Sequence, residues 1–287
     1  MSDLDAPPAS PSRSHVAETA QLPPIPAPAA GVARPLLHFF ADWFLAMFAM
    51  IAMMVSTGFV WAMLRGIRIG MQEGFAGMDA SALMQAVGKP SAVATIAMVL
   101  VSTGGTALLL YFWRRPATAA ERAYSRQAAM SRSTWANVAL VGIGVFLFST
   151  LVTRLGQSLG VTPNPSNLVL IKDVFATHPV FLILFAVVLA PAYEELLFRR
   201  VLFGRLWAAG WPWLGAALSS LAFALAHELP GANGNEPLAT LLLWTIYAGM
   251  GMVFAWLYRR TGTLWAPIGA HMLNNALALS VFGLAGG

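Results

Sequence analysis

The strongest constraint on this chain is a series of long apolar segments that contain almost no charge. A helix that crosses a membrane needs about 20 largely apolar residues. Strands of a membrane barrel would instead alternate apolar and polar residues over about ten positions. We therefore expect an all-α fold, a polytopic membrane helix bundle with about seven transmembrane helices. The predicted spans are residues 36–64, 91–113, 135–152, 179 to beyond 193, 213–229, 238–257 and 264–284.

The composition favours the membrane over other partners of a basic protein. The chain is 58% hydrophobic and 10% charged, with a net charge of +5, whereas an average soluble domain has about 25% charged residues. A positive charge alone would suit nucleic acid or an anionic membrane surface. With this hydrophobicity we expect the lipid bilayer as a partner and no nucleic acid. The absence of cysteine excludes disulfides and thiolate metal sites.

Positive residues predict the orientation of the bundle, because they concentrate in cytoplasmic loops. With the N-terminus inside, twelve of the 17 Lys and Arg residues fall on the cytoplasmic side. We therefore expect an N-in, C-out protein of a bacterial inner (plasma) membrane.

The first 34 residues differ from the rest of the chain. They are rich in Pro, Ala and Ser and show no apolar period, which is typical of a disordered tail. We expect a disordered cytoplasmic tail at 1–34 and a transmembrane domain at 35–287.

Two adjacent carboxylates occupy the fourth predicted span. Charged groups within a span are costly and usually mark function. Glu195 and Arg199 are four residues apart and share a helix face, so they are placed to pair. Glu194 lies about 100° round the helix and is left available as a base. Pro191 is expected to leave the carbonyl of Val187 without its donor. The alternative is a structural ion cluster.

Two further spans carry the other polar residues. Phe223 and His227 share a face, and so do His271 and Asn275. Glu194 and His227 are equally distant from the predicted turn at 209–212, roughly 24 Å along each helix. We therefore expect these side chains to meet in one cavity below the membrane surface. Each pair alone would be satisfied by ordinary hydrogen bonding between helices.

The ordered set Glu194-Glu195-x-x-x-Arg199, Phe223-x-x-x-His227 and His271-x-x-x-Asn275 resembles the CPBP family. These are CAAX-protease and bacteriocin-processing intramembrane proteases, related to the type II CAAX prenyl endopeptidase and the Abi proteins. The resemblance covers about 179–280. It implies an intramembrane endopeptidase in which Glu194 activates water and His227, His271 and Asn275 complete the site. The implied substrate is a membrane-embedded or lipidated peptide or protein.

Several alternatives stay open at the level of sequence. Glu194, His227 and His271 could form a two-His, one-carboxylate Zn²⁺ site with an open position for water. The same polar cluster could serve a non-catalytic membrane scaffold or bacteriocin-immunity protein. It could also form the proton relay of a proton-coupled transporter.

Overall fold

The computed structural model describes residues 31–72, 74, 78–231 and 234–284, and every regular element in these ranges is a helix. The expected all-α fold is thereby confirmed. The first 30 residues of the predicted tail lie outside the described residues. Helix α1 begins at Ala33, within the last two residues assigned to the tail.

Seven long helical segments coincide with the seven predicted ones. Two of them are composite, because stretches of π-helix interrupt the α-helix. The segment Ala92–Arg114 consists of α3 (Ala92–Val99), η1 (Leu100–Gly104) and α4 (Gly105–Arg114). The segment Pro179–Ala208 consists of α8 (Pro179–Ile183), η2 (Leu184–Leu189), α9 (Ala190–Glu195), η3 (Leu196–Phe203) and α10 (Gly204–Ala208). The others are α1 (Ala33–Gln72), α6 (Arg132–Ser158), α11 (Pro212–His227), α12 (Pro237–Thr261) and α13 (Trp265–Leu284).

Three short helices lie where the sequence predicts only loops: α2 (Ala80–Val87), α5 (Ala119–Ala129) and α7 (Leu168–Thr177). Helix α5 carries a capping box, in which Thr118 and Glu121 bond each other's backbone N–H groups. These helices are shorter than the roughly 20 apolar residues of a membrane span, so a search for long apolar segments does not find them.

Five of the seven segments are long and apolar enough to cross a membrane: α1, Ala92–Arg114, α6, Pro179–Ala208 and α12. Helix α11 is apolar but shorter, with 16 residues. Helix α13 carries His271, Asn274 and Asn275, which lower its apolar content. The protein is thus an all-α membrane helix bundle, but the predicted count of seven spans is not confirmed. Its orientation remains a prediction.

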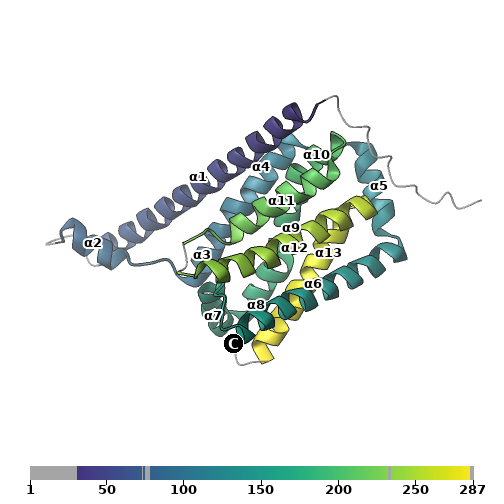
Figure 1. Ribbon diagram of the computed structural model, residues 1–287. Coiled ribbons are helices and arrows are strands. Elements are labelled where there is room, and N and C mark those ends of the chain that lie inside the picture. The colour runs from purple at the N-terminus through teal and green to yellow at the C-terminus, as the bar shows by residue number, and fades with distance from the viewer. Residues whose placement is uncertain (1–30, 73, 75–77, 232–233, 285–287) are drawn as a thin grey trace, which may run out of the picture.

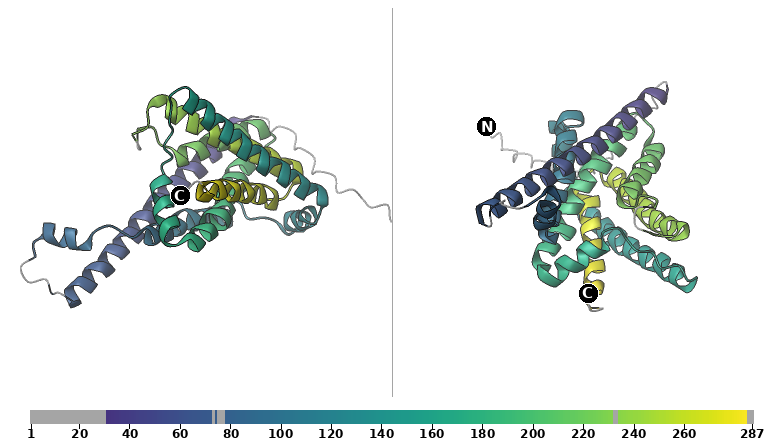
Figure 2. Two further views of the ribbon diagram at one scale, coloured as in Figure 1. Left: turned by 90° about the horizontal axis from the view of Figure 1, so that it is seen from below. Right: turned by 90° about the vertical axis from the view of Figure 1, so that its left-hand side faces the viewer.

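Helix α1 lies along one side of the bundle and extends well beyond it, with α2 near its far end (Figures 1 and 2). Most of its large apolar side chains are exposed, as expected of a helix that faces lipid. Helix α11 packs against α12, and α13 packs against both α6 and α9. The second half of the composite segment Pro179–Ala208, from η3 onward, is largely buried among these neighbours.

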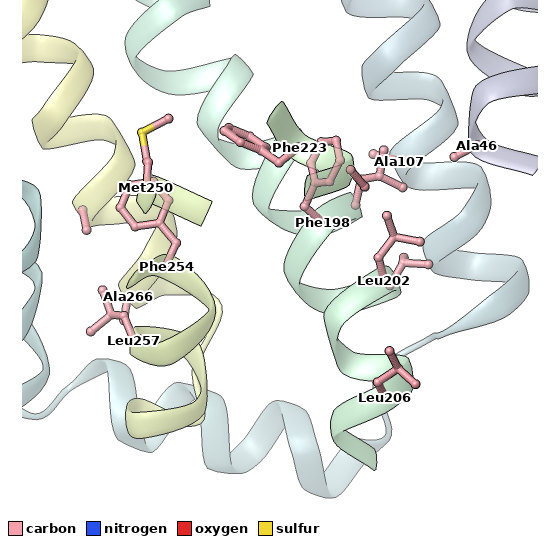
Figure 3. Close-up of a cluster of buried hydrophobic side chains, with 14 of the residues drawn as sticks. Ala46, Ala107, Phe198, Leu202, Leu206, Phe223, Met250, Phe254, Leu257 and Ala266 are labelled. Atoms are coloured by element: carbon pink, nitrogen blue, oxygen red, sulfur yellow. The ribbon is translucent and has the colours of Figure 1, made fainter. Parts of the chain in front are cut away.

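The apolar core lies where η3, α11 and α12 meet (Figure 3). Phe198 and Phe223 pack edge to face with ring centroids 5.0 Å apart. Helices α11 and α12 approach each other closely at Gly251, where an added Cβ would lie 2.8 Å from the Cβ of Ser220. Small residues permit such contacts between membrane helices. The core therefore fixes α11 relative to α12, and both carry residues of the site described below.

A buried carboxylate ties α1 to the bundle. Asp42 is fully buried and binds Arg114 at 2.6 Å and Arg205 at 2.5 Å. These partners lie at the ends of α4 and α10. A buried charge in an apolar protein requires such compensation, so Asp42 anchors the otherwise lightly packed α1.

A second ion pair docks the amphipathic helix α5 onto η3. Arg200 donates to both carboxylate oxygens of Glu121, at 2.9 and 2.8 Å. The hydrogen bond from Arg200 is the main cause that lowers the pKa of Glu121 to about 2. The charged form of Glu121 is therefore favoured in the folded protein.

We expect Glu121→Gln to lower the thermal midpoint at neutral pH, with a loss of up to about 1 kcal/mol for this half-exposed pair. Gln retains the capping box, so the change removes mainly the charge. Because the folded pKa is depressed, the stabilisation is complete above the ordinary value of 4.5 and is lost as the pH falls toward 2. Thermal unfolding of both proteins at several pH values would check this. A difference that stays constant down to about pH 3 would contradict it.

Candidate active site

The centre of the site is the pair of carboxylates on α9, between two stretches of π-helix. Glu195 is fully buried and lies 2.9 Å from Arg199, so the structure contains the predicted ion pair. The Glu194 side chain retains 17% of its accessible surface. The two neighbouring residues therefore occupy different environments, one sealed and one open.

Both predicted histidines face these carboxylates. His271 Nδ1 lies 3.1 Å from Glu195 Oε1, and His271 Nε2 lies 3.8 Å from Glu194 Oε2. His227 Nε2 lies 3.9 Å from the same oxygen of Glu194. The structure thus brings together residues from α9, α11 and α13; equal distance from the turn at 209–212 predicts this for Glu194 and His227. That turn contains Gly210, which has a φ of 84° and precedes Pro212 at the start of α11.

Hydrogen bonds at Nδ1 determine which nitrogen of each imidazole can accept. His227 Nδ1 lies 2.9 Å from the carbonyl oxygen of Phe223. A carbonyl can only accept, so Nδ1 carries the proton and Nε2 is the acceptor in neutral His227. The carboxylate of Glu195 likewise requires a proton on Nδ1 of His271. Each Nε2 is therefore directed toward Glu194, at 3.8 and 3.9 Å from its Oε2.

Arg199 is held by aromatic rings as well as by charge. Its guanidinium carbon lies 4.9 Å from the ring centroid of Phe223 and 5.6 Å from that of Phe254. Cation–π contacts of this kind are stronger when water is excluded, and Arg199 is fully buried. The same Phe223 ring lies 4.3 Å from the His227 ring, centroid to centroid. Phe223 and Phe254 therefore connect the ion pair to both α11 and α12.

Asn275 lies at the edge of the site, bonded to the π-helix. The N–H of Ala190 donates to the carbonyl of Phe185, five residues back. The next donor in this register would be Pro191, which has no N–H, so the carbonyl of Ala186 is left without a backbone partner. Asn275 Nδ2 donates to that carbonyl at 2.8 Å. The expectation for Val187 was based on an α-helical register, and the π-helix moves the effect by one residue.

Four residues that the sequence does not single out hold His227 in place. The Tyr247 ring stacks on the His227 ring, with centroids 4.6 Å apart. Ser166 Oγ donates to the His227 carbonyl, and Ser166 N donates to Glu228 Oε1, both at 2.7 Å. Trp244 Nε1 donates to the Glu228 carbonyl. His227 is the last residue of α11, so these contacts secure a helix end that would otherwise fray.

Glu228 is the first residue after α11. Glu228 is buried, with 1% of its surface accessible. Its position directly after His227 is the one sequence signal for a supporting role. Tyr247 has no comparable signal, because it is one of several aromatic residues on an apolar helix.

The side chains proposed for zinc are too widely spaced for that ion in this arrangement. Bonds of about 2.0–2.1 Å in a tetrahedral site hold the ligand atoms about 3.3 Å apart. The atoms of Glu194, His227 and His271 are separated by 3.8 and 3.9 Å. Within the described residues, no three His, Asp or Glu side chains are grouped as a metal would require. The side chains would therefore have to move closer together to bind zinc.

Comparison with known proteins places residues 176–277 within a family described as type II CAAX prenyl endopeptidase Rce1-like. The chain is 29% identical over 143 residues to YdiL of Bacillus subtilis (strain 168), which is provisionally named a membrane peptidase. That alignment covers 49% of this chain and 54% of YdiL. The chain is 32% identical over 147 residues to MroQ of Staphylococcus aureus (strain USA300), named a membrane-embedded CAAX protease, covering 49% and 53% of the two chains.

A third relative is an uncharacterized 24.3 kDa protein of Escherichia coli, 31% identical over 144 residues, covering 50% of this chain and 59% of the relative. The chain thus spans about half the length of the curated relatives it matches. No solved structure matches it. The three motifs fall within the matched segment, and the resemblance seen in the sequence is thereby confirmed: residues 176–277 match the family of type II CAAX prenyl endopeptidase Rce1-like proteins.

Proposed function

We propose that this protein is an intramembrane endopeptidase that cleaves membrane-embedded or lipidated proteins with a water molecule activated by Glu194. The observation that carries the proposal is the convergence of Glu194, His227 and His271, with both Nε2 atoms within 3.9 Å of one carboxylate oxygen. The Rce1-like segment and the relatives named as membrane peptidases support it. We further propose a bacterial inner (plasma) membrane as its location.

Glu194 is the general base in this mechanism. A water molecule among the three side chains donates one hydrogen to Glu194 and the other to Nε2 of His227. Its lone pair is then free to attack the carbonyl carbon of the scissile peptide bond. Glu194 takes the proton as the bond forms and returns it to the leaving amine. The partial exposure of Glu194 provides the access that a water molecule requires.

His271 stabilises the oxyanion that forms on the peptide carbonyl. Its Nδ1 lies beside Glu195, and that carboxylate stabilises an imidazolium whose Nε2–H then donates to the oxyanion. With one additional proton on His271, the formal charges of Glu194, Glu195, Arg199 and His271 sum to zero. A neutral group of charges suits an apolar bundle. Asn275 donates one amide hydrogen to the carbonyl of Ala186. We propose that its second amide hydrogen donates to the oxyanion.

The buried ion pair and the aromatic rings position the reacting groups. Arg199 holds Glu195, and Glu195 orients His271. Tyr247 and the Phe223 carbonyl orient His227. Preorganised donors of this kind avoid a reorganisation cost during the reaction.

We expect Glu194→Gln to reduce cleavage by about 10²–10⁴-fold, because the amide cannot accept the proton of the water. Proteomic mapping of new protein termini in membranes that carry either form would detect the loss. Glu236→Gln, at an exposed position before α12, is the matched control and should retain activity. Wild-type cleavage by Glu194→Gln would refute the base.

The same substitution separates the proposed activity from its rivals. A peptidase should act in detergent without any ion gradient, whereas a proton-coupled transporter would require one. A scaffold or immunity protein would release no new termini from its partner. Cleavage in detergent that depends on Glu194 therefore distinguishes all three functions.

Removal of metal should leave the activity intact, because the atoms of Glu194, His227 and His271 are further apart than the ligands of a tetrahedral zinc site. Elemental analysis of the purified protein, combined with a cleavage assay in the presence of a chelator, measures this directly. One equivalent of bound metal, with activity that chelation abolishes and zinc restores, would establish the two-His, one-carboxylate alternative.

Tyr247 should act through the position of His227. We expect Tyr247→Ala to lower kcat by about 10- to 10²-fold with little change in KM, since a small misplacement of a reacting group has an effect of this size. Tyr247→Phe retains the stacked ring and is expected to retain most of the activity. Equal losses in the two variants would assign the effect to the hydroxyl group instead of the stacked ring.

A further inference from the structure

A basic cavity lies away from the candidate active site, at the end of the bundle where α1 begins and α10 ends. It has a volume of roughly 630 Å³ and is lined by residues of α1, α10 and the segment after α4. Four of these residues carry basic side chains: Arg34, His38, Arg115 and Arg205. The cavity therefore has the character of an anion-binding site.

The acidic groups near the cavity do not neutralise it. Asp42 is bound by Arg114 and Arg205, so one carboxylate is shared by two guanidinium groups. Among the described residues, neither Arg34 nor Arg115 forms an ion pair with a carboxylate. Within the described ranges, Arg34 thus has no carboxylate partner, and Arg115 has only the more distant charge of Glu121.

Arg115 also has unused hydrogen-bonding capacity. Its Nη2 donates to the carbonyl of Gly204 at 2.9 Å, which fixes the guanidinium at the wall. Its Nε is buried and makes no hydrogen bond within the described part of the chain. A buried donor without a partner is costly, so the guanidinium of Arg115 is incompletely compensated by the protein.

The surroundings of the cavity have the features of a membrane interface. Arg259 lies over the Trp213 ring, 5.2 Å from its centroid, and Arg260 lies over Trp256 at 5.4 Å. Tryptophan and basic residues concentrate at the level of lipid headgroups. These pairs come from the end of α12 and the start of α11, the end of the bundle that also holds α10 (Figure 1).

An exposed apolar surface of α1 begins one turn beyond the cavity. Leu37 is 68% exposed, and Phe44 and Phe48 continue the apolar surface along the helix. A molecule with its anionic group beside Arg34 could place hydrocarbon chains along these residues. This continuity favours a lipid over a free anion.

We propose that the cavity binds the phosphate group of an anionic phospholipid. The guanidinium groups of Arg34 and Arg115 contact the phosphate oxygens, which suits the geometry of Arg–phosphate pairs. The acyl chains lie along the exposed face of α1. A zwitterionic lipid binds more weakly, because its own cation meets the same basic wall.

The test is a binding measurement on the full chain in a non-ionic detergent, with dioctanoyl phosphatidylglycerol and dioctanoyl phosphatidylcholine as probes. We expect saturable binding of phosphatidylglycerol and a much higher Kd for phosphatidylcholine. Arg34→Gln should raise the Kd for phosphatidylglycerol about fivefold, since one basic residue at a membrane surface contributes about a factor of five. The double variant Arg34→Gln with Arg115→Gln should raise it about 25-fold.

Arg126→Gln is the matched control, because it removes the same charge from the exposed surface of α5 at the same end of the bundle. Its Kd should be that of the wild type. Arg34 is exposed, so its substitution tests binding without disturbing the fold.

Three results would overturn the proposal: equal Kd values for the two lipids, equal weakening in Arg126→Gln, or full displacement of the lipid by inorganic phosphate at the same concentration. The readout is binding, so it is independent of whether the chain is a peptidase.

Discussion

The buried ion pair between Glu195 and Arg199 is the contact on which the candidate site depends. Neither side chain has accessible surface, and an isolated charge at that position would be strongly unfavourable. The pair is surrounded by Phe223 from α11, Phe254 from α12 and His271 from α13. Three helices are therefore fixed around one pair of charges. The contacts that these helices make with the pair keep them in register, which holds the histidines opposite Glu194.

The two adjacent glutamates show how one helix turn can supply both structure and chemistry. Glu195 is sealed among partners that satisfy its charge, whereas Glu194 is partly exposed and lies beside two imidazole rings. Consecutive residues on a helix point in directions about 100° apart, so the chain can direct one carboxylate inward to Arg199 and the other toward a substrate. The site requires both, because a base is effective only in a fixed position.

Much of this arrangement could be predicted from the sequence, because it follows from helix periodicity. The Glu195–Arg199 pair, the turn before Pro212 and the convergence of Glu194 with His227 and His271 all depend on spacing along helices. Asp42 could not be assigned its partners in this way, since Arg114 and Arg205 are 72 and 163 residues away. The stacking of Tyr247 on His227 and the burial of Glu228 likewise depend on how separate helices pack. The π-helical turns were missed because they are a departure from the period itself.

Those π-helical turns give the segment Pro179–Ala208 an internal change of phase. A π-turn accommodates about one more residue than an α-turn, so each stretch rotates everything beyond it relative to a continuous α-helix. The direction of the α9 carboxylates therefore does not follow, by α-helical spacing, from the direction of the lipid-facing residues before Leu184. If the same residues formed a continuous α-helix, the carboxylates would be turned about 100° around the axis relative to the preceding helix. The π-helical stretch 184–189 is therefore itself part of the site.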